Sequence, residues 1–172
     1  PSSGEIYLDS AKIDEANLQS YQAKISAIFA DFYLFSQTLS RDGFASQSDI
    51  EELLALLEID KKVSVVDNKL STTQLSTGQR KRLSLLIAIL ERRSILILDE
   101  WAADQDPLFK RKFYKEILPF LQSKGMSIIA VSHDDSYFDG ATRIILVKDG
   151  FVRELDESER ASAAKDAVEK IK

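Results

Sequence analysis

Two acidic residues, Asp99 and Glu100, directly follow the apolar run Ile-Leu-Ile-Leu at positions 95–98. A continuous apolar run of this length is typical of a parallel strand that is buried on both faces. Open α/β sheets bind their ligands at the carboxyl ends of such strands. There, one carboxylate can hold a magnesium ion while the other orients or deprotonates a water molecule. Taken alone, the pair fits the solvated end of a strand equally well.

The only histidine of the chain, His133, also follows an apolar run, residues 126–131, and a serine at 132. A single histidine is more often a structural residue than a catalytic one. The run before it predicts a second buried strand, and neighbouring parallel strands end at the same edge of a sheet. We therefore expect His133 and Glu100 to lie on adjacent strand tips.

A helix is expected to begin after Ser76, because a serine N-cap with Gln79 three residues later forms a capping box. The apolar residues behind it recur at helical spacing on one face: Leu83, Leu86, Ile87 and Leu90. Gly78 then serves as a close-approach residue, and the same helix start can hold a phosphate through its backbone N–H groups.

Two neighbouring features invite a functional reading that we do not prefer. Arg80, Lys81 and Arg82 crowd the first turns of this helix, and we interpret them as a solvated helix face rather than a phosphate-binding patch. Trp101, the only tryptophan, is interpreted as a packing residue near the loop that follows Asp99 and Glu100, rather than as a platform for adenine.

The remaining elements follow from periodicity and punctuation. We expect a short strand at 5–9, a helical turn and a strand within 18–28, a helix at 49–59 and a polar connector at 63–73. Pro107 fits the first turn of a helix over 108–121, which Pro119 should bend or end early. A strand at 144–147, a turn at 148–150 and a helix at 156–172, with Ala164, Ala167, Val168 and Ile171 as its apolar stripe, complete the chain.

The stretch from Leu75 to Asp106 resembles the signature, Walker B and D-loop motifs of the ATP-binding-cassette (ABC) family, in their usual order. Residues 75–79 match the signature except that Thr77 replaces its first glycine, and residues 95–100 match Walker B. Ala103 and Asp104 depart from the usual Ser-Ala of the D-loop. The amino-acid sequence of residues 99–107 is most similar to that of exporters of cyclic peptides and siderophores.

This resemblance implies roles for individual residues around ATP and Mg²⁺. Asp99 would hold magnesium through water, and Glu100 would polarise the attacking water. His133 falls on the H-loop histidine, which contacts the γ-phosphate. In the family, the signature element, here Ser76, Gly78 and Gln79, docks onto ATP held by a second ATP-binding domain in a head-to-tail dimer. Asp106 falls on the D-loop aspartate.

The resemblance also implies a fold and a cellular setting. We expect an α/β, partial P-loop NTPase (ABC-type) fold with a mainly parallel sheet flanked by helices. Residues 36–92 would form a small helical subdomain with the signature helix, and residues 1–35 and 93–172 a RecA-like core. The transmembrane domains of the same transporter would be partners, at the cytoplasmic face of the plasma (inner) membrane. Ala30 falls on the Q-loop glutamine, with Asp31 as the nearest oxygen ligand.

A P-loop is missing from these 172 residues, because none of the six glycines begins the spacing Gly-x-x-x-x-Gly-Lys-Ser/Thr. The domain is therefore incomplete, and we expect this chain alone to bind ATP poorly and to be inactive. We also expect the missing P-loop strand to lie beside the strand at 95–98, so that its absence leaves strand edges open.

Composition limits the alternatives. The net charge of −5 argues against a nucleic-acid-binding surface, and no apolar run approaches the roughly 18 residues that span a bilayer, so we expect the piece itself to be soluble. A catalytically silent interaction or regulatory module stays open. A DNA-associated ATPase of the SMC type is less favoured, since those chains insert very long coiled coils between Q-loop and signature.

Overall fold

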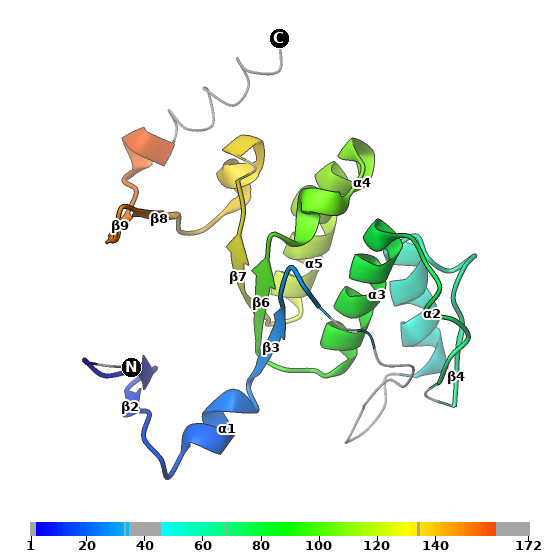
Figure 1. Cartoon of the computed structure of the whole chain (residues 1–172), viewed down its shortest axis with the longest axis horizontal. Coiled ribbons are helices and arrows are strands. Elements are labelled where there is room, and N and C mark those ends of the chain that lie inside the picture. The colour runs from blue at the N-terminus through cyan, green and yellow to red at the C-terminus, as the bar shows by residue number, and fades with distance from the viewer. Residues whose placement is uncertain (1–2, 33, 35–45, 68, 134, 161–172) are drawn as a thin grey trace.

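The computed structural model describes residues 3–32, 34, 46–67, 69–133 and 135–160 (Figure 1). A parallel sheet of three strands lies at its centre, in the order β3 (Ile25–Ile28), β6 (Ile95–Asp99) and β7 (Ser127–Val131). The central strand pairs in register on both sides, with Ile95 opposite Ile25 of β3 and Ser127 of β7. The α/β class with a parallel sheet is thus confirmed.

Among the described residues, four α-helices flank this sheet. α2 (Gln47–Leu56) and α3 (Thr77–Leu90) lie side by side on one side of it, and α4 (Pro107–Lys112) and α5 (Leu118–Ser123) follow β6 in the chain (Figure 1). α2 begins at Gln47, two residues before the start that the sequence predicts, and Ser46 closes a capping box at this end. α3 buries the predicted stripe residues Leu83, Leu86 and Leu90.

The segment predicted as one helix over 108–121 contains a wide π turn, Phe113–Ile117, between α4 and α5. The backbone N–H of Leu118 bonds the carbonyl of Phe113, five residues earlier. Pro119 has no N–H, and its ring would clash with the carbonyl four residues before it in a regular helix. Local widening relieves that clash, so Pro119 does not end the helix, which runs on to Ser123.

Short elements connect these layers. They comprise α1 (Leu18–Gln22) and the antiparallel pairs β1 (Tyr7–Leu8) with β2 (Ala11–Lys12), β4 (Val65–Val66) with β5 (Lys69–Leu70), and β8 (Ile145–Lys148) with β9 (Phe151–Glu154). The predicted turn at 148–150 joins β8 to β9. The irregular connector predicted at 63–73 is wrong, because β4 and β5 form a hairpin there and bury Val63 and Val65. Of the predicted C-terminal helix, residues 157–160 are helical, and its apolar stripe lies outside the described residues.

The prediction that β6 has an open edge is also wrong, since both of its edges are paired. An apolar run shows that a strand is buried but not which strands are its neighbours. Within the described part of the chain, β7 pairs only with β6, and its residues Ile129 and Val131 are about half exposed, at 55% and 51%. In the described part of the chain, β3 and β7 are therefore the two edge strands of this sheet, and β7 is the one that exposes large apolar side chains.

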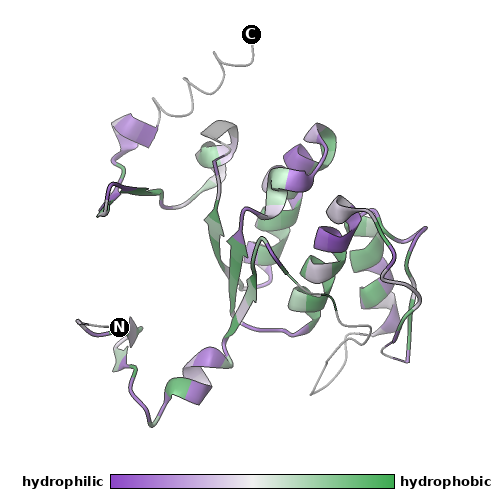
Figure 2. Ribbon diagram, in the orientation of Figure 1, coloured by the Kyte–Doolittle hydropathy of each residue, from purple (hydrophilic) through white to green (hydrophobic). Residues whose placement is uncertain are grey.

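Hydrophobic residues concentrate on the strands of the central sheet and on the facing sides of the helices (Figure 2). One continuous core joins α2, α3, β6 and the α4–α5 segment. Its largest fully buried side chains are Trp101, Phe109, Phe113, Leu57, Ile59, Leu83, Leu85, Leu86, Leu96, Leu98, Ile117 and Leu121. None of the helices in the described ranges has both the length and the apolar character that crossing a bilayer requires.

Candidate functional site

The predicted acidic pair and the histidine meet at the carboxyl ends of β6 and β7. Asp99 is the last residue of β6 and lies opposite Val131, the last residue of β7. Glu100 and His133 follow these two ends, and Oε1 of Glu100 lies 3.3 Å from Nε2 of His133. The Glu100 side chain is 29% exposed and that of His133 is 94% exposed. The placement on adjacent strand tips agrees with the sequence prediction.

Glu100 adopts a left-handed backbone conformation, with φ 47° and ψ 33°, which is costly for a residue with a Cβ atom. Its N–H donates to the carbonyl of Val131 at 3.1 Å, and its carbonyl accepts from Nζ of Lys81 at 2.9 Å. Its Oε1 atom is buried and makes no hydrogen bond with the described residues, the His133 contact being of ion-pair range only. A buried acceptor without a donor fits a water molecule held there.

The signature segment forms the predicted capping box. The hydroxyl of Ser76 accepts from the N–H of Gln79, whose side-chain oxygen accepts from the N–H of Ser76, both at 3.3 Å. Gly78 packs against the loop after β6, because a Cβ atom there would lie 2.9 Å from the carbonyl oxygen of Asp104. Nε2 of Gln105 donates to the carbonyl of Gly78 at 3.1 Å. The close-approach role of Gly78 is thus observed.

Asp106 caps α4. Its Oδ1 accepts from the N–H of Phe109 at 3.0 Å, and its Oδ2 accepts from Arg82 at 2.9 Å. The hydrogen bond from Phe109 lowers the pKa of the Asp106 carboxyl from its ordinary value and the charge of Arg82 adds to this, while desolvation opposes both. Asp106 is therefore a charged cap that also joins α3 to α4.

The basic run is not the solvated face that we expected. Lys81 is 2% exposed, and its Nζ lies 2.8 Å from Oδ2 of Asp104. The guanidinium of Arg82 lies 3.4 Å from the centroid of the Phe109 ring. Lys81 binds acceptors in the loop after β6, and Arg82 contacts Gln105 of that loop and the ring of Phe109 on α4. Spacing in the sequence gives no sign of this, since the partners come from another element.

Trp101 packs as predicted. It is 2% exposed, its ring stacks on Phe113 with centroids 4.3 Å apart, and its Nε1 donates to the carbonyl of Lys81 at 3.0 Å. A second residue that sequence analysis missed is Tyr114 in the π turn. Its hydroxyl lies 2.8 Å from that of Ser132, next to His133.

The described residues hold no group of three or more histidine, cysteine or acidic side chains arranged around a common metal position. Magnesium at nucleotide sites is typically bound by one or two carboxylates, with waters and substrate phosphates as the other ligands. Asp99 is half-buried and directly precedes Glu100 in the chain, and its carboxylate is a fitting donor for such a site.

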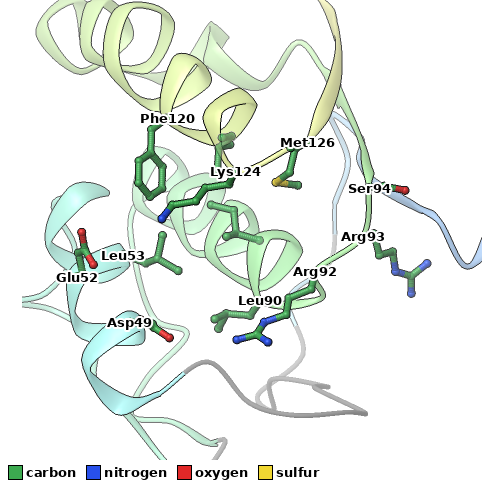
Figure 3. Close-up of a pocket in the computed structure, with 13 residues that line it drawn as sticks. Asp49, Glu52, Leu53, Leu90, Arg92, Arg93, Ser94, Phe120, Lys124 and Met126 are labelled. Atoms are coloured by element: carbon green, nitrogen blue, oxygen red, sulfur yellow. The ribbon is translucent and has the colours of Figure 1, made fainter.

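A pocket of about 510 Å³ lies elsewhere, between α2, the end of α3 and the end of α5 (Figure 3). Its lining includes Arg92 and Ser94, which precede β6, and Met126, which precedes β7. The pocket therefore sits at the amino ends of the parallel strands, whereas Glu100 and His133 follow their carboxyl ends. It is not part of the candidate site.

The chain was compared with known protein families. The model of the family described as ABC transporter matches residues 1–103. The chain belongs to the ABC transporter family. The match covers the signature and Walker B segments of this ABC chain, while Asp106 and His133 lie beyond it.

Relatives agree with this membership. The chain is 43% identical to the ATP-binding protein SyrD of Pseudomonas syringae pv. syringae over 155 residues, which is 88% of this chain and 27% of SyrD. The ABC chain thus spans about a quarter of that relative. A dimeric, post-hydrolysis structure of the ATP-binding cassette MJ0796 with ADP and Pi is similar in fold (TM-score 0.67, 23% identity, 91% of this chain and 75% of that one). So is a bacterial Atm1-family ABC exporter with ATP bound (TM-score 0.77, 16% identity, 99% and 32%).

Proposed function

We propose that this chain forms the catalytic part of the ATP-binding domain of an ABC exporter and takes part in ATP hydrolysis. The observation that carries the proposal is the 3.3 Å approach of Glu100 to His133 at the tips of β6 and β7, directly after Asp99. Family membership supplies the substrate, ATP, and the strand tips supply groups of the right chemistry.

Each group has a distinct task in this proposal. Asp99 would hold Mg²⁺, which would neutralise charge on the phosphates. The unpartnered Oε1 of Glu100 accepts a hydrogen bond from the attacking water and orients it. His133, with its ring almost fully exposed, would contact the γ-phosphate. Positioning and electrostatic stabilisation of this kind supply most of the acceleration in phosphoryl transfer.

We propose further that the P-loop comes from polypeptide outside these 172 residues. The unpaired edge of β7 and its exposed Ile129 and Val131 offer a place for another strand of the same domain. The share of the MJ0796 cassette that this chain covers, 75%, leaves room for such a segment. Residues 36–92 would then form the helical subdomain, and residues 1–35 and 93–172 would belong to the RecA-like core.

Two such domains would close head to tail on ATP. Ser76, Gly78 and Gln79 of one domain would contact ATP held by the other, and Asp106 would stand near the contact between them. The dimeric form of the MJ0796 cassette supports this arrangement. Closure and reopening would drive transmembrane domains at the cytoplasmic face of the membrane. The sequence of the D-loop region, residues 99–107, favours a cyclic peptide or a siderophore as cargo.

The substitution Glu100→Gln in the purified transporter tests the proposal. It keeps the size of the side chain but removes the charge that orients water, so hydrolysis should fall about 100-fold or more, whereas ATP binding should persist. The matched control is Glu116→Gln, a change at an exposed position that should leave hydrolysis unaltered.

Two outcomes would contradict the proposal. Wild-type rates of phosphate release in the Glu100→Gln protein would exclude Glu100 from the chemistry. No phosphate release from the unaltered transporter, with or without cargo, would make the chain a silent interaction module.

A further inference from the structure

Lys81 is a buried cation with an unusual set of partners. Only 3% of its side chain is exposed, and a buried ammonium is costly unless it is paired and hydrogen-bonded. Its Nζ meets both needs in the loop after β6: it lies 2.8 Å from the carboxylate of Asp104 and 2.9 Å from the backbone carbonyl of Glu100. The carbonyl of Lys81 accepts from Trp101 in return. The ammonium and the backbone carbonyl of Lys81 thus both bond to residues of the same short turn, 100–104.

That turn sets the direction of the Glu100 side chain. The left-handed conformation of Glu100 (φ 47°) is one that residues with a Cβ atom rarely keep without support. β7 supports it from one side, through the bond from the Glu100 N–H to Val131. Lys81 supports it from the other side, through the Glu100 carbonyl. Oε1 of the carboxylate is buried and accepts no hydrogen bond within the described residues, and it approaches Nε2 of His133 at 3.3 Å.

We propose that Lys81 is a positioning residue for ATP hydrolysis. Its ammonium, balanced by Asp104, holds the backbone of Glu100 in the turn that aims the carboxylate at His133. This inference rests on the proposed function, in which Glu100 orients the attacking water. Asp104 is then a functional replacement at a D-loop position where the sequence departs from the usual alanine.

The partners of Lys81 require its charged hydrogen-bond donor and not merely the volume of its side chain. An apolar side chain of similar length would fill the same space and avoid the desolvation of an ammonium. Only a donor can hold the Glu100 carbonyl. Gly78, three residues earlier on α3, packs on Asp104 as well, so the signature helix and the Glu100 turn are joined at two points.

The experiment compares kinetics and stability in the purified transporter. Lys81→Met keeps the volume but removes the donor and the charge. We expect kcat for ATP to fall about tenfold, because a small misplacement of the water-orienting group weakens the chemical step, with KM changed by less than about twofold. Lys112→Met is the matched control, since it removes another paired lysine, 2.8 Å from Glu58, with no bond to the Glu100 turn.

A structural role alone would give a different result. Leu121→Val, a core change on α5 far along the chain from Lys81, provides a variant with lowered Tm. If Lys81→Met loses no more kcat than Leu121→Val at an equal loss of Tm, the proposal is overturned. If Lys81→Met does not fold, Asp104→Asn provides the test, because it removes the counter-charge of Lys81 from a half-exposed position. A fall in kcat at constant KM supports the proposal. An unchanged kcat overturns it.

Glu100→Gln separates this inference from the proposed function. If Glu100→Gln abolishes hydrolysis while folded Lys81→Met turns over ATP like the wild type, the positioning role of Lys81 fails and the proposed function stands. If Glu100→Gln itself retains hydrolysis, the proposed function fails and the inference falls with it.

Discussion

The hydroxyl of Tyr114 lies 2.8 Å from the hydroxyl of Ser132, the residue that precedes His133. The Tyr114 ring also stacks on Tyr137, with centroids 4.5 Å apart and planes inclined by 10°. Tyr114 lies in the π turn between α4 and α5. The irregular helix therefore supports the segment that carries His133.

Under the proposed function, Tyr114→Phe should lower ATP hydrolysis a fewfold and leave the fold intact. The change keeps the ring stack and removes a hydroxyl whose bond contributes about 1 kcal/mol, so the Ser132–His133 segment loses part of its support. Phosphate release and thermal unfolding measure the two effects. A variant with full activity would show that the Tyr114 hydroxyl does not help to hold His133.

Gly78→Ala should destabilise the chain, because the added Cβ atom would lie 2.9 Å from the backbone oxygen of Asp104. Backbone yields less readily than the end of a side chain, and overpacking of this kind costs about 1–3 kcal/mol. Gly140→Ala is the matched control, since a Cβ atom there meets nothing within 4 Å. Urea unfolding of the two variants should separate them. Equal midpoints would contradict the close contact between α3 and the loop after β6.

The sequence predicts the parts of this site that depend on local rules. The capping box of Ser76 and Gln79 and the position of Glu100 after an apolar strand follow from neighbours in the chain, and both are observed. The burial of Lys81 does not follow in this way, because its partner Asp104 lies in a separate element and the pairing depends on how α3 packs on the loop. For the same reason, an apolar run did not reveal that β6 has a neighbour on each side.

Asp106 gives a prediction about pH. Its pKa is lowered in the folded chain from an ordinary value of 3.8, mainly by the hydrogen bond from Phe109. A lowered pKa means that the charged form contributes stability that is fully present above the unfolded pKa and is lost as pH falls through the folded pKa. Asp106→Ala should lower the free energy of unfolding by about 1 kcal/mol near pH 7.

Asp106→Asn separates the charge from the cap, because asparagine also caps helices well. The difference in unfolding free energy between the wild type and Asp106→Asn should shrink as the pH falls below 3.8. Chemical denaturation at several pH values measures it. A difference that stays constant over this range would show that the charge of Asp106 adds nothing to the stability of α4.

The open edge of β7 predicts that the 172-residue chain associates with itself. Unpaired strand N–H and C=O groups beside apolar side chains favour pairing with another strand, and a charged residue on the edge blocks it. Ile129→Lys should therefore reduce association in sedimentation velocity experiments at matched concentrations. Leu108→Lys is the control: Leu108 is 83% exposed but lies on helix α4, whose backbone offers no strand edge. If both variants reduce association equally, the association depends on exposed apolar side chains in general and not on the β7 edge. A wild-type chain that stays monomeric at every concentration would show that the β7 edge is not available for pairing.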